Sequence, residues 1–210
     1  MTLDDGIELC DDEAVALASY FAPRPQFAVP QYLFDHQTGT ITNAQHTVTL
    51  AAVLPACDTE ADLFVGGEKD VLSEITEGGP TYGDRRLGSS SGSGARSDGP
   101  KAWFTGGSKG CHQPDVTALA QCDGTVDVNL SNTGELSRYP VDFTIKAGDF
   151  DKTLIVGPGK AETVRVHWRH PQHTRARRRT APTGAGSGVA PYHWSRVRRR
   201  AAPLERSSGT

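Results

Sequence analysis

The sequence has no long apolar run, because its uninterrupted hydrophobic stretches are only a few residues long. A transmembrane helix needs about 20 such residues, so we expect no membrane span. Hydrophobic residues make up 36% of the chain, whereas glycine (23 residues) and proline (13 residues) are abundant. This composition is typical of short strands joined by many turns, with part of the chain disordered.

Cysteines are few and widely spaced: Cys10, Cys57, Cys111 and Cys122. Without a CxxC or Cys/His finger spacing, a zinc site is not expected. An even count favours two disulfides and an exported, oxidising setting, although three pairings are open and four buried thiols are the alternative. A bond between Cys57 and Cys111 would enclose a glycine-rich loop and stabilise the fold by roughly 4 kcal/mol.

No catalytic signature is present either. The GxSxG elbow of serine hydrolases is absent, and no nucleophile accompanies the histidines of the body, which we expect at the surface: His36, His46 and His112. We therefore predict a non-enzymatic protein. The alternative is a fragment of a secreted hydrolase, which convergent Asp, Glu or His side chains in one pocket would favour.

Candidate metal ligands lack a supporting pattern, so we predict no metal site and no cofactor. Two pairs of aspartates have the hard oxygen ligands that Ca²⁺ prefers: Asp149 with Asp151, and Asp123 with Asp127. No EF-hand spacing surrounds them, and aspartates that bond their own turns explain them more simply. Three histidines recur at a spacing of three: His167, His170 and His173. Pro171 lies between them, which disfavours one helical face.

Alternation of apolar and polar residues, the pattern of half-buried strands, recurs in several short segments. The apolar members are Val48, Leu50, Ala52 and Leu54; Val126, Val128 and Leu130; Val141, Phe143 and Ile145; Leu154 and Val156; and Val164 and Val166. Spacings near ten residues predict an all-β protein, an antiparallel β-sandwich with Ig-like modules. Prolines at 23, 25 and 30 predict an edge strand around them.

Composition divides the chain into four parts. We expect an N-terminal segment over 1–20, a β-rich domain over 21–116, a small Ig-like module over 117–166 and an Arg-rich tail over 167–210. Residues 77–101 are rich in Gly and Ser, which predicts a flexible loop. Near this loop, Tyr82, Trp103 and Phe104 are candidates for a sugar- or protein-binding face, with Tyr32 beside them; packing in the core is the favoured alternative for Trp103 and Phe104.

Charge separates the tail from the rest. Residues 1–166 contain 24 Asp and Glu against 12 Lys and Arg, a net charge of −12, whereas residues 167–210 contain 10 Arg and one Glu, a net charge of +9. The tail has no Lys, Asp, Asn, Ile or Phe, and Arg, Ala, Pro and Gly have GC-rich codons. Our leading hypothesis is therefore a disordered tail translated out of frame from about His167.

The alternative for the tail is a nucleic-acid-binding arm. ARRR at 176–179 and RVRRR at 196–200 would contact phosphates, and the tail's aromatic residues would stack on bases: Trp168, Tyr192 and Trp194. Short arginine clusters recur by composition alone. The acidic body would also repel a polyanion, so we do not expect nucleic acid as a partner.

Several phrases of the body resemble a known family: QFAVPQYLFDHQTGTIT, DLFVGGEKDVLSEIT, PTYGDRRLGS, KAWFTGGSKGC and QCDGTVDVNLSNTGELSRYPVDFTI. They are similar to the extracellular, repeat-free portion of sortase-dependent surface proteins of actinomycetes, over roughly residues 20–166. The resemblance implies an export signal, a β-rich ectodomain and an LAETG- or LPxTG-type sorting motif. The start MTLDDGIELCDDE has no apolar signal region, and no sorting motif is found, so we expect the true N-terminus to be missing unless the protein is cytosolic.

Taken with the cysteines, the resemblance predicts a secreted, cell-wall-associated structural or adhesive β module. Its partner would be an extracellular protein or polysaccharide that the residues do not identify.

Overall fold

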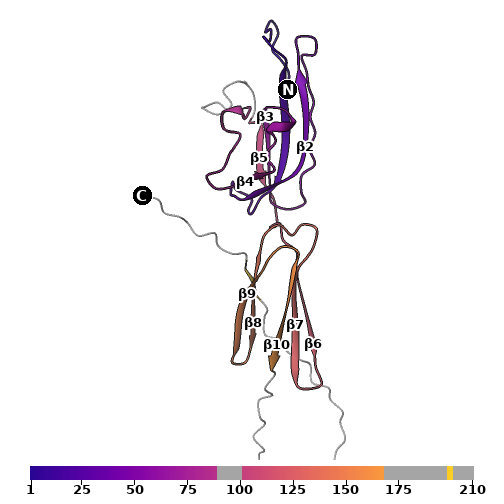
Figure 1. The fold of residues 1–210 in the computed structure, drawn as a ribbon, viewed down its shortest axis with the longest axis vertical. Coiled ribbons are helices and arrows are strands. Elements are labelled where there is room, and N and C mark those ends of the chain that lie inside the picture. Colours follow the sequence, from indigo (N-terminus) through magenta and orange to yellow (C-terminus); the bar gives the residue numbers. More distant parts are fainter. Residues whose placement is uncertain (89–100, 168–197, 201–210) are drawn as a thin grey trace, which may run out of the picture. The chain divides into compact units, whose positions relative to one another are not determined.

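A computed structural model describes residues 1–88, 101–167 and 198–200 (Figure 1). The chain forms two compact units. The first unit comprises Met1–His112 and Glu135–Tyr139, and the second comprises Gln113–Gly134 and Pro140–Thr210. Every strand pairing between the named strands is antiparallel. Within the described ranges, no helix has the length and hydropathy to cross a bilayer.

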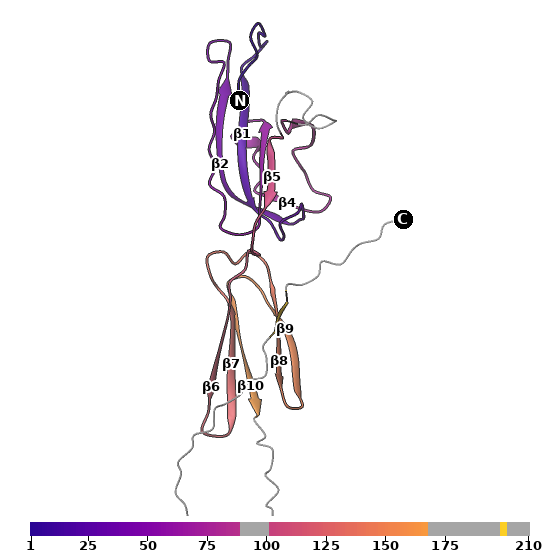
Figure 2. The same ribbon diagram turned by 180° about the vertical axis from the view of Figure 1, so that it is seen from behind.

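The first unit is built on one five-stranded sheet with the strand order β4-β2-β1-β3-β5 (Figure 2). Its strands are β1 (Glu13–Phe21), β2 (Gln31–Ile41), β3 (Thr59–Val65), β4 (Glu74–Ile75) and β5 (Trp103–Gly106). Two short 3₁₀ helices, η1 (Glu68–Asp70) and η2 (Gly83–Arg85), lie in the connection between β3 and β5.

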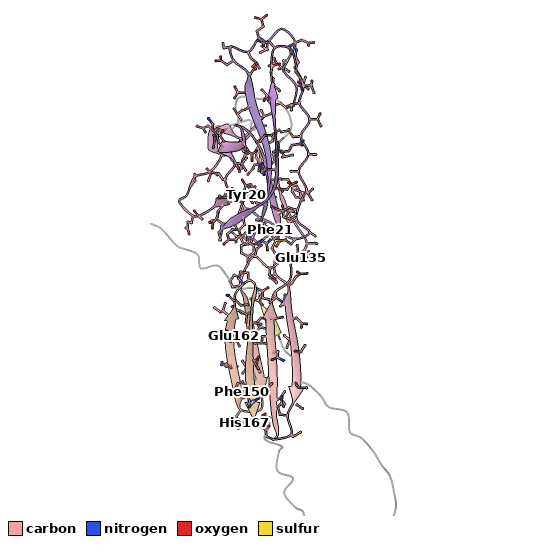
Figure 3. All side chains as sticks on the ribbon, turned by 45° about the vertical axis from the view of Figure 1, so that its right-hand side comes forward. Tyr20, Phe21, Glu135, Phe150, Glu162 and His167 are labelled. Atoms are coloured by element: carbon pink, nitrogen blue, oxygen red, sulfur yellow. A yellow bond between two sulfur atoms is a disulfide. The ribbon has the colours of Figure 1, made fainter. Side chains whose placement is uncertain are left out.

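β1 is the central strand of this sheet, whereas the sequence suggested a separate segment over 1–20. Its residues Ala14–Phe21 are buried or half-buried on both faces, which explains the small and apolar sequence AVALASYF. Tyr20 and Phe21, labelled in Figure 3, enter different hydrophobic clusters, since successive side chains of a strand point to opposite faces. β2 begins directly after Pro30, and among the described strands its outer edge pairs with the two-residue β4 alone.

The strand predicted around Val48–Leu54 is wrong, because this segment has no strand pairing. Side chains of β2 hold it in place of a backbone ladder. The Ala51 amide donates to the Gln37 side chain at 2.5 Å, and the Val53 amide donates to the Asp35 carboxylate at 2.6 Å. A Cβ added at Gly39 would lie 2.5 Å from Val48 Cγ2, so the glycine permits the close approach of this segment.

The flexible loop expected over 77–101 is ordered in its first part. Tyr82 and Leu87 are almost fully buried. The Leu87 amide donates to the carbonyl of Leu63 in β3 at 2.9 Å. Burial of these two side chains fixes residues 77–88 against the sheet. Residues 89–100 lie outside the described residues.

The second unit has two three-stranded sheets, with the strand orders β10-β7-β6 and β11-β8-β9. Its strands are β6 (Pro114–Ala120), β7 (Thr125–Asn132), β8 (Val141–Ala147), β9 (Phe150–Val156), β10 (Lys160–His167) and β11 (Arg198–Arg200). One core contains side chains from both sheets: Val126, Val128, Leu130, Val141, Phe143, Ile145, Val156, Val164 and Val166.

All nine of these core positions are among those predicted from alternation, so the inward faces of β7, β8 and β10 are confirmed. Leu154, the other position predicted on β9, packs against the same core and is half-buried. Within the predicted tail, His167 ends β10 and Arg198–Arg200 form β11. The other residues of the tail lie outside the described residues.

Candidate functional site

The disulfide joins Cys57, just before β3, to Cys111, after β5, with a Cα–Cα distance of 5.1 Å. Both cysteines are buried in a cluster with Phe21. The Asp58 amide also donates to the Lys109 carbonyl at 2.8 Å. The disulfide and this hydrogen bond therefore close the same pair of segments at one end of β3.

The segment Glu135–Tyr139 packs on this disulfide cluster within the first unit. The Tyr139 hydroxyl lies 2.9 Å from the Phe21 carbonyl and 2.8 Å from the Pro30 carbonyl. The Arg138 guanidinium lies 4.4 Å from the centre of the Phe21 ring. The Arg138 amide donates to the Cys111 carbonyl at 2.9 Å.

The second expected disulfide is not formed. Cys10 and Cys122 are exposed free cysteines. They belong to different units, so the packing of neither unit supplies a partner thiol. The pairing of Cys57 with Cys111, one of the pairings that the sequence left open, is the bond present.

A polar cluster is buried on the face of β1 and β3 that Tyr20 shares, opposite the face of Phe21 and the disulfide. We call it the acid cluster, and its members are Gln31, Glu60, Asp62 and Arg86. Glu60 and Asp62 are 1% and 0% exposed; they are two residues apart on β3 and therefore share a face. Opposite Asp62 on β1 stands Ala18, whose small side chain leaves space above the sheet.

Arg86 is positioned beside β3, where it forms an isolated bridge with Phe64. Its Nη2 donates to Glu60 Oε1 at 3.2 Å, and its Nε lies 2.9 Å from Asp62 Oδ1. The second contact is an ion pair whose N–H is not aligned for a hydrogen bond. Gln31 Nε2 donates to Glu60 Oε2 at 2.7 Å. Two carboxylates thus share one guanidinium.

Burial is the largest influence on both acids. It raises the pKa of Asp62 to about 7, against the attraction of Arg86. It also raises the pKa of Glu60, although the hydrogen bond from Gln31 and the charge of Arg86 oppose it. Among the described residues, Asp62 Oδ2 has no hydrogen-bond partner. A carboxyl group in this position therefore retains its proton well above the usual pH.

Two buried tyrosines complete this side of the core. Leu72 N–H donates to the Tyr82 hydroxyl at 3.0 Å, and the Tyr20 hydroxyl donates to the Leu72 carbonyl at 3.0 Å. The two hydroxyls also bond each other, so donation from Tyr82 to Tyr20 satisfies all three bonds. The Tyr82 ring stacks on Phe64 with a centroid distance of 3.6 Å. Burial raises the pKa of both tyrosines.

The acid cluster does not open to solvent as a catalytic site would. A surface depression of about 300 Å³ is lined by Phe27, Thr81, Gly83 and Arg86, and only Arg86 belongs to both. The carboxyl groups of Glu60 and Asp62 are out of reach of a substrate in this conformation. The arrangement therefore orders the core and presents one neutralised guanidinium at its margin.

Sequence reasoning missed the acid cluster because polar and apolar residues alternate in β3 from Glu60 to Leu63. In TEADLFV, Ala61, Leu63 and Val65 form the apolar set, so Glu60 and Asp62 are expected on a solvent face. In the structure, residues 66–88 cover that face. No local pattern predicts such a cover, although two acids within a strand otherwise rich in apolar residues are an available signal.

The three candidate binding-face aromatics do not form one surface. Tyr82 lies in the core, so its proposed surface position is wrong. Trp103 is half-buried, and two cations lie near its ring centre, Arg86 at 5.5 Å and Lys101 at 4.7 Å. Phe104 points to the other face of β5 and is 49% exposed. Tyr32 packs on Tyr139 with a ring-centroid distance of 5.7 Å.

Three exposed apolar side chains lie on one face of the first sheet, and we call Phe34, Val53 and Phe104 the apolar patch. Phe104 stands opposite Ala61 of β3, and Ala61 stands opposite Ser19 of β1. Phe104, Ala61 and Ser19 therefore share a face of the sheet. The Ser19 hydroxyl donates to the Val53 carbonyl at 2.6 Å, which places Val53 over the same face. Phe34 contacts Phe21 edge to face at 4.9 Å. All three patch side chains are at least 40% exposed.

The histidines predicted at the surface, His36, His46 and His112, are spread over the first unit. His36 lies 2.8 Å from the exposed Glu68 carboxylate, and His46 Nε2 lies 2.8 Å from the Asn43 carbonyl. His112 is half-buried, and burial lowers its pKa. His167 is exposed at the end of β10, while residues 170 and 173 fall outside the described ranges, as do the tail aromatics at 168, 192 and 194.

Three aspartates of the predicted pairs, Asp123, Asp127 and Asp151, bond other residues of the protein. Asp123 accepts the Thr125 amide at 3.0 Å and the Thr125 hydroxyl at 2.6 Å, which confirms a turn aspartate. The same prediction is wrong for the other two, because Asp127 lies in β7 and pairs with Arg165, and Asp151 lies in β9 and pairs with Lys146. Across the described part of the chain, no three His, Cys, Asp or Glu side chains gather as metal ligands do.

Comparisons of the whole chain with models of protein families, with curated proteins and with solved structures found no match.

Proposed function

We propose that this chain is a non-enzymatic, extracellular β module that has a structural or adhesive role at the cell wall. The observation that carries the proposal is the buried Cys57–Cys111 disulfide. Such bonds persist in oxidising compartments and are rare where glutathione keeps thiols reduced. The resemblance to sortase-dependent surface proteins adds the cell wall as the location.

The apolar patch supports the adhesive part of the proposal. Phe34, Val53 and Phe104 leave large apolar surfaces in water on one face of the first unit, and grouped exposure of this kind marks interaction sites. The sheet beneath is rigid, because the acid cluster, the paired tyrosines and the disulfide all fix β1 and β3. A rigid surface binds with a smaller entropic cost than a loop. The partner class is a wall polysaccharide or an extracellular protein.

The test is retention of the oxidised, purified protein on actinomycete cell-wall sacculi in a sedimentation assay. We expect the double variant F34S/F104S to be retained less than the parent chain. The matched control is L119S/I155S, which removes two apolar side chains of the second unit. Leu119 and Ile155 are more exposed than Phe34 and Phe104. An absence of retention, or equal loss in both variants, would contradict an adhesive patch.

The same incubation tests the alternative that the chain is a fragment of a secreted hydrolase. A hydrolase fragment would release soluble sugars or peptides from the sacculi with time, in proportion to the protein added. Such release, abolished by heat denaturation of the protein, would replace the non-enzymatic proposal.

A further inference from the structure

The sheet that contains β8 is completed by a strand distant in the sequence. β8 and β9 form a hairpin, and Arg198–Arg200 pair with the other edge of β8. The register places Arg198 opposite Thr144, Arg199 opposite Phe143 and Arg200 opposite Asp142. β8 is therefore the central strand of this sheet, and its outer edge is paired at Asp142, Phe143 and Thr144.

The outer edge of β8 has few of the features by which proteins protect unpaired strand edges. Its sequence VDFTIKA contains no proline, and its single lysine lies near the end. Its register with β9 is continuous from Val141–Val156 to Ala147–Phe150, without a bulge. An edge of this kind is a template for another strand.

β8 also supplies three deeply buried side chains to the core of the second unit, Val141, Phe143 and Ile145. The edge of β8 is consequently held in a fixed, extended conformation before any strand is added. Pairing with such a preformed edge requires ordering of the incoming strand only.

Charge favours an arginine-rich strand at this edge. The register sets an arginine opposite Asp142, whose Oδ1 is buried and has no hydrogen-bond partner among the described residues. On a larger scale, the net charge of residues 1–166 is −12 and that of residues 167–210 is +9. Opposite net charges raise the local concentration of the tail at the body.

We propose that the outer edge of β8 is a strand-acceptor site that binds an extended, arginine-rich segment by antiparallel β-pairing. In this chain the occupant is Arg198–Arg200. Main-chain hydrogen bonds supply the affinity and charge supplies the preference for arginine, as in other cases of strand addition. In this proposal, part of the RVRRR sequence pairs with β8 and does not contact the phosphates of a nucleic acid.

The test is hydrogen exchange of the full chain, measured on peptides that cover β8. The variant R199P removes the backbone N–H of the central residue of β11 and fixes its φ near −65°, which is unlike that of a paired antiparallel strand. The control R178P makes the same change in the RRR triplet at 177–179, which has the same composition. We expect about tenfold faster exchange in β8 for R199P and no change for R178P, since unpaired edges exchange more readily.

A readout in the other sheet guards against general unfolding. Peptides that cover β7 are expected to exchange at the parental rate in both variants. Equal exchange of β8 in the parent and R199P would overturn the proposal. So would equal acceleration by R199P and R178P, because it would mean that the tail is attracted by charge without a specific register.

Discussion

The two units bury their strands in opposite ways. In β8 of the second unit, apolar residues face a core of aliphatic and aromatic side chains and polar residues face outward. In β3 of the first unit, both faces are covered, and the polar set that includes Glu60 and Asp62 is fully enclosed. Alternation along a strand therefore predicts which face is inward only when the other face meets water. Where connections cover both faces, charge and hydroxyl groups become part of the core.

The largest expected difference between the units concerns the disulfide. The double variant C57S/C111S should lower the free energy of unfolding of the first unit by about 4 kcal/mol, because the bond joins cysteines 54 residues apart and restricts the unfolded chain accordingly. The second unit should retain its stability. Urea titration followed by hydrogen exchange of peptides from each unit measures both, and equal loss in the two units would show that they unfold together.

A matched pair of arginine variants compares buried with exposed ion pairs. R86M leaves two buried carboxyl groups without their cation, and we expect a loss of about 3 kcal/mol at pH 8, at the lower end of the usual cost because Arg86 is partly exposed. R165M removes an exposed pair with Asp127 and should leave the unfolding midpoint unchanged. If both variants unfold at the parental midpoint, the acid cluster makes no contribution to stability.

The paired tyrosines provide a smaller comparison. Y82F keeps the stacked ring but leaves the Leu72 amide without its acceptor, and we expect a loss of about 2 kcal/mol from this unsatisfied donor. T153V removes an exposed hydroxyl that bonds Thr144 in the second unit, with no measurable change expected. Thermal unfolding of the two variants measures whether the buried hydroxyl of the first unit contributes more to stability than the exposed hydroxyl of the second.

The last comparison uses pH. Between its ordinary pKa of 3.8 and its folded pKa of about 7, Asp62 holds a proton in the folded state that the unfolded chain has released. The stability from this group is complete below about pH 4 and is lost as the pH rises through 7, with a slope of at most about 1.4 kcal/mol per pH unit. D62N should flatten the slope to the part due to Glu60 and Asp58, whose pKa values burial also raises, whereas the control D115N should retain it. An unchanged slope in D62N would assign the pH dependence to other groups.

The residues of the second unit made its strands predictable. Val126, Val128, Leu130, Val141, Phe143 and Ile145 lie inward as alternation requires, because one face of each sheet meets solvent. The Val48–Leu54 segment has the same pattern but is not a strand. Val48 and Leu50 lie over Gly39 on the sheet face. Side chains of β2 accept the amides of Ala51 and Val53, and the Val48 amide donates to the Met1 carbonyl. Periodicity reports which residues are buried together, not whether their backbone joins a ladder.

The candidate surfaces were less predictable than the fold. Tyr82 and Phe104 are both aromatics near the Gly/Ser segment, yet one is buried and the other is exposed. What separates them is the path of residues 77–88 over the sheet, which depends on contacts with Phe64 and Leu63 from another strand. The Ig-like topology of the second unit and the cell-wall location stay predictions.

By itself, the sequence determined the all-β class, the inward faces of the second unit and the charge contrast between body and tail, because these follow from local composition and period. Only the tertiary structure decided which cysteines join, that Glu60 and Asp62 share Arg86 inside the first unit, and that Arg198–Arg200 lie against β8. Each of these depends on residues far apart in the chain, whose meeting is fixed by the packing of whole strands and not by any local preference.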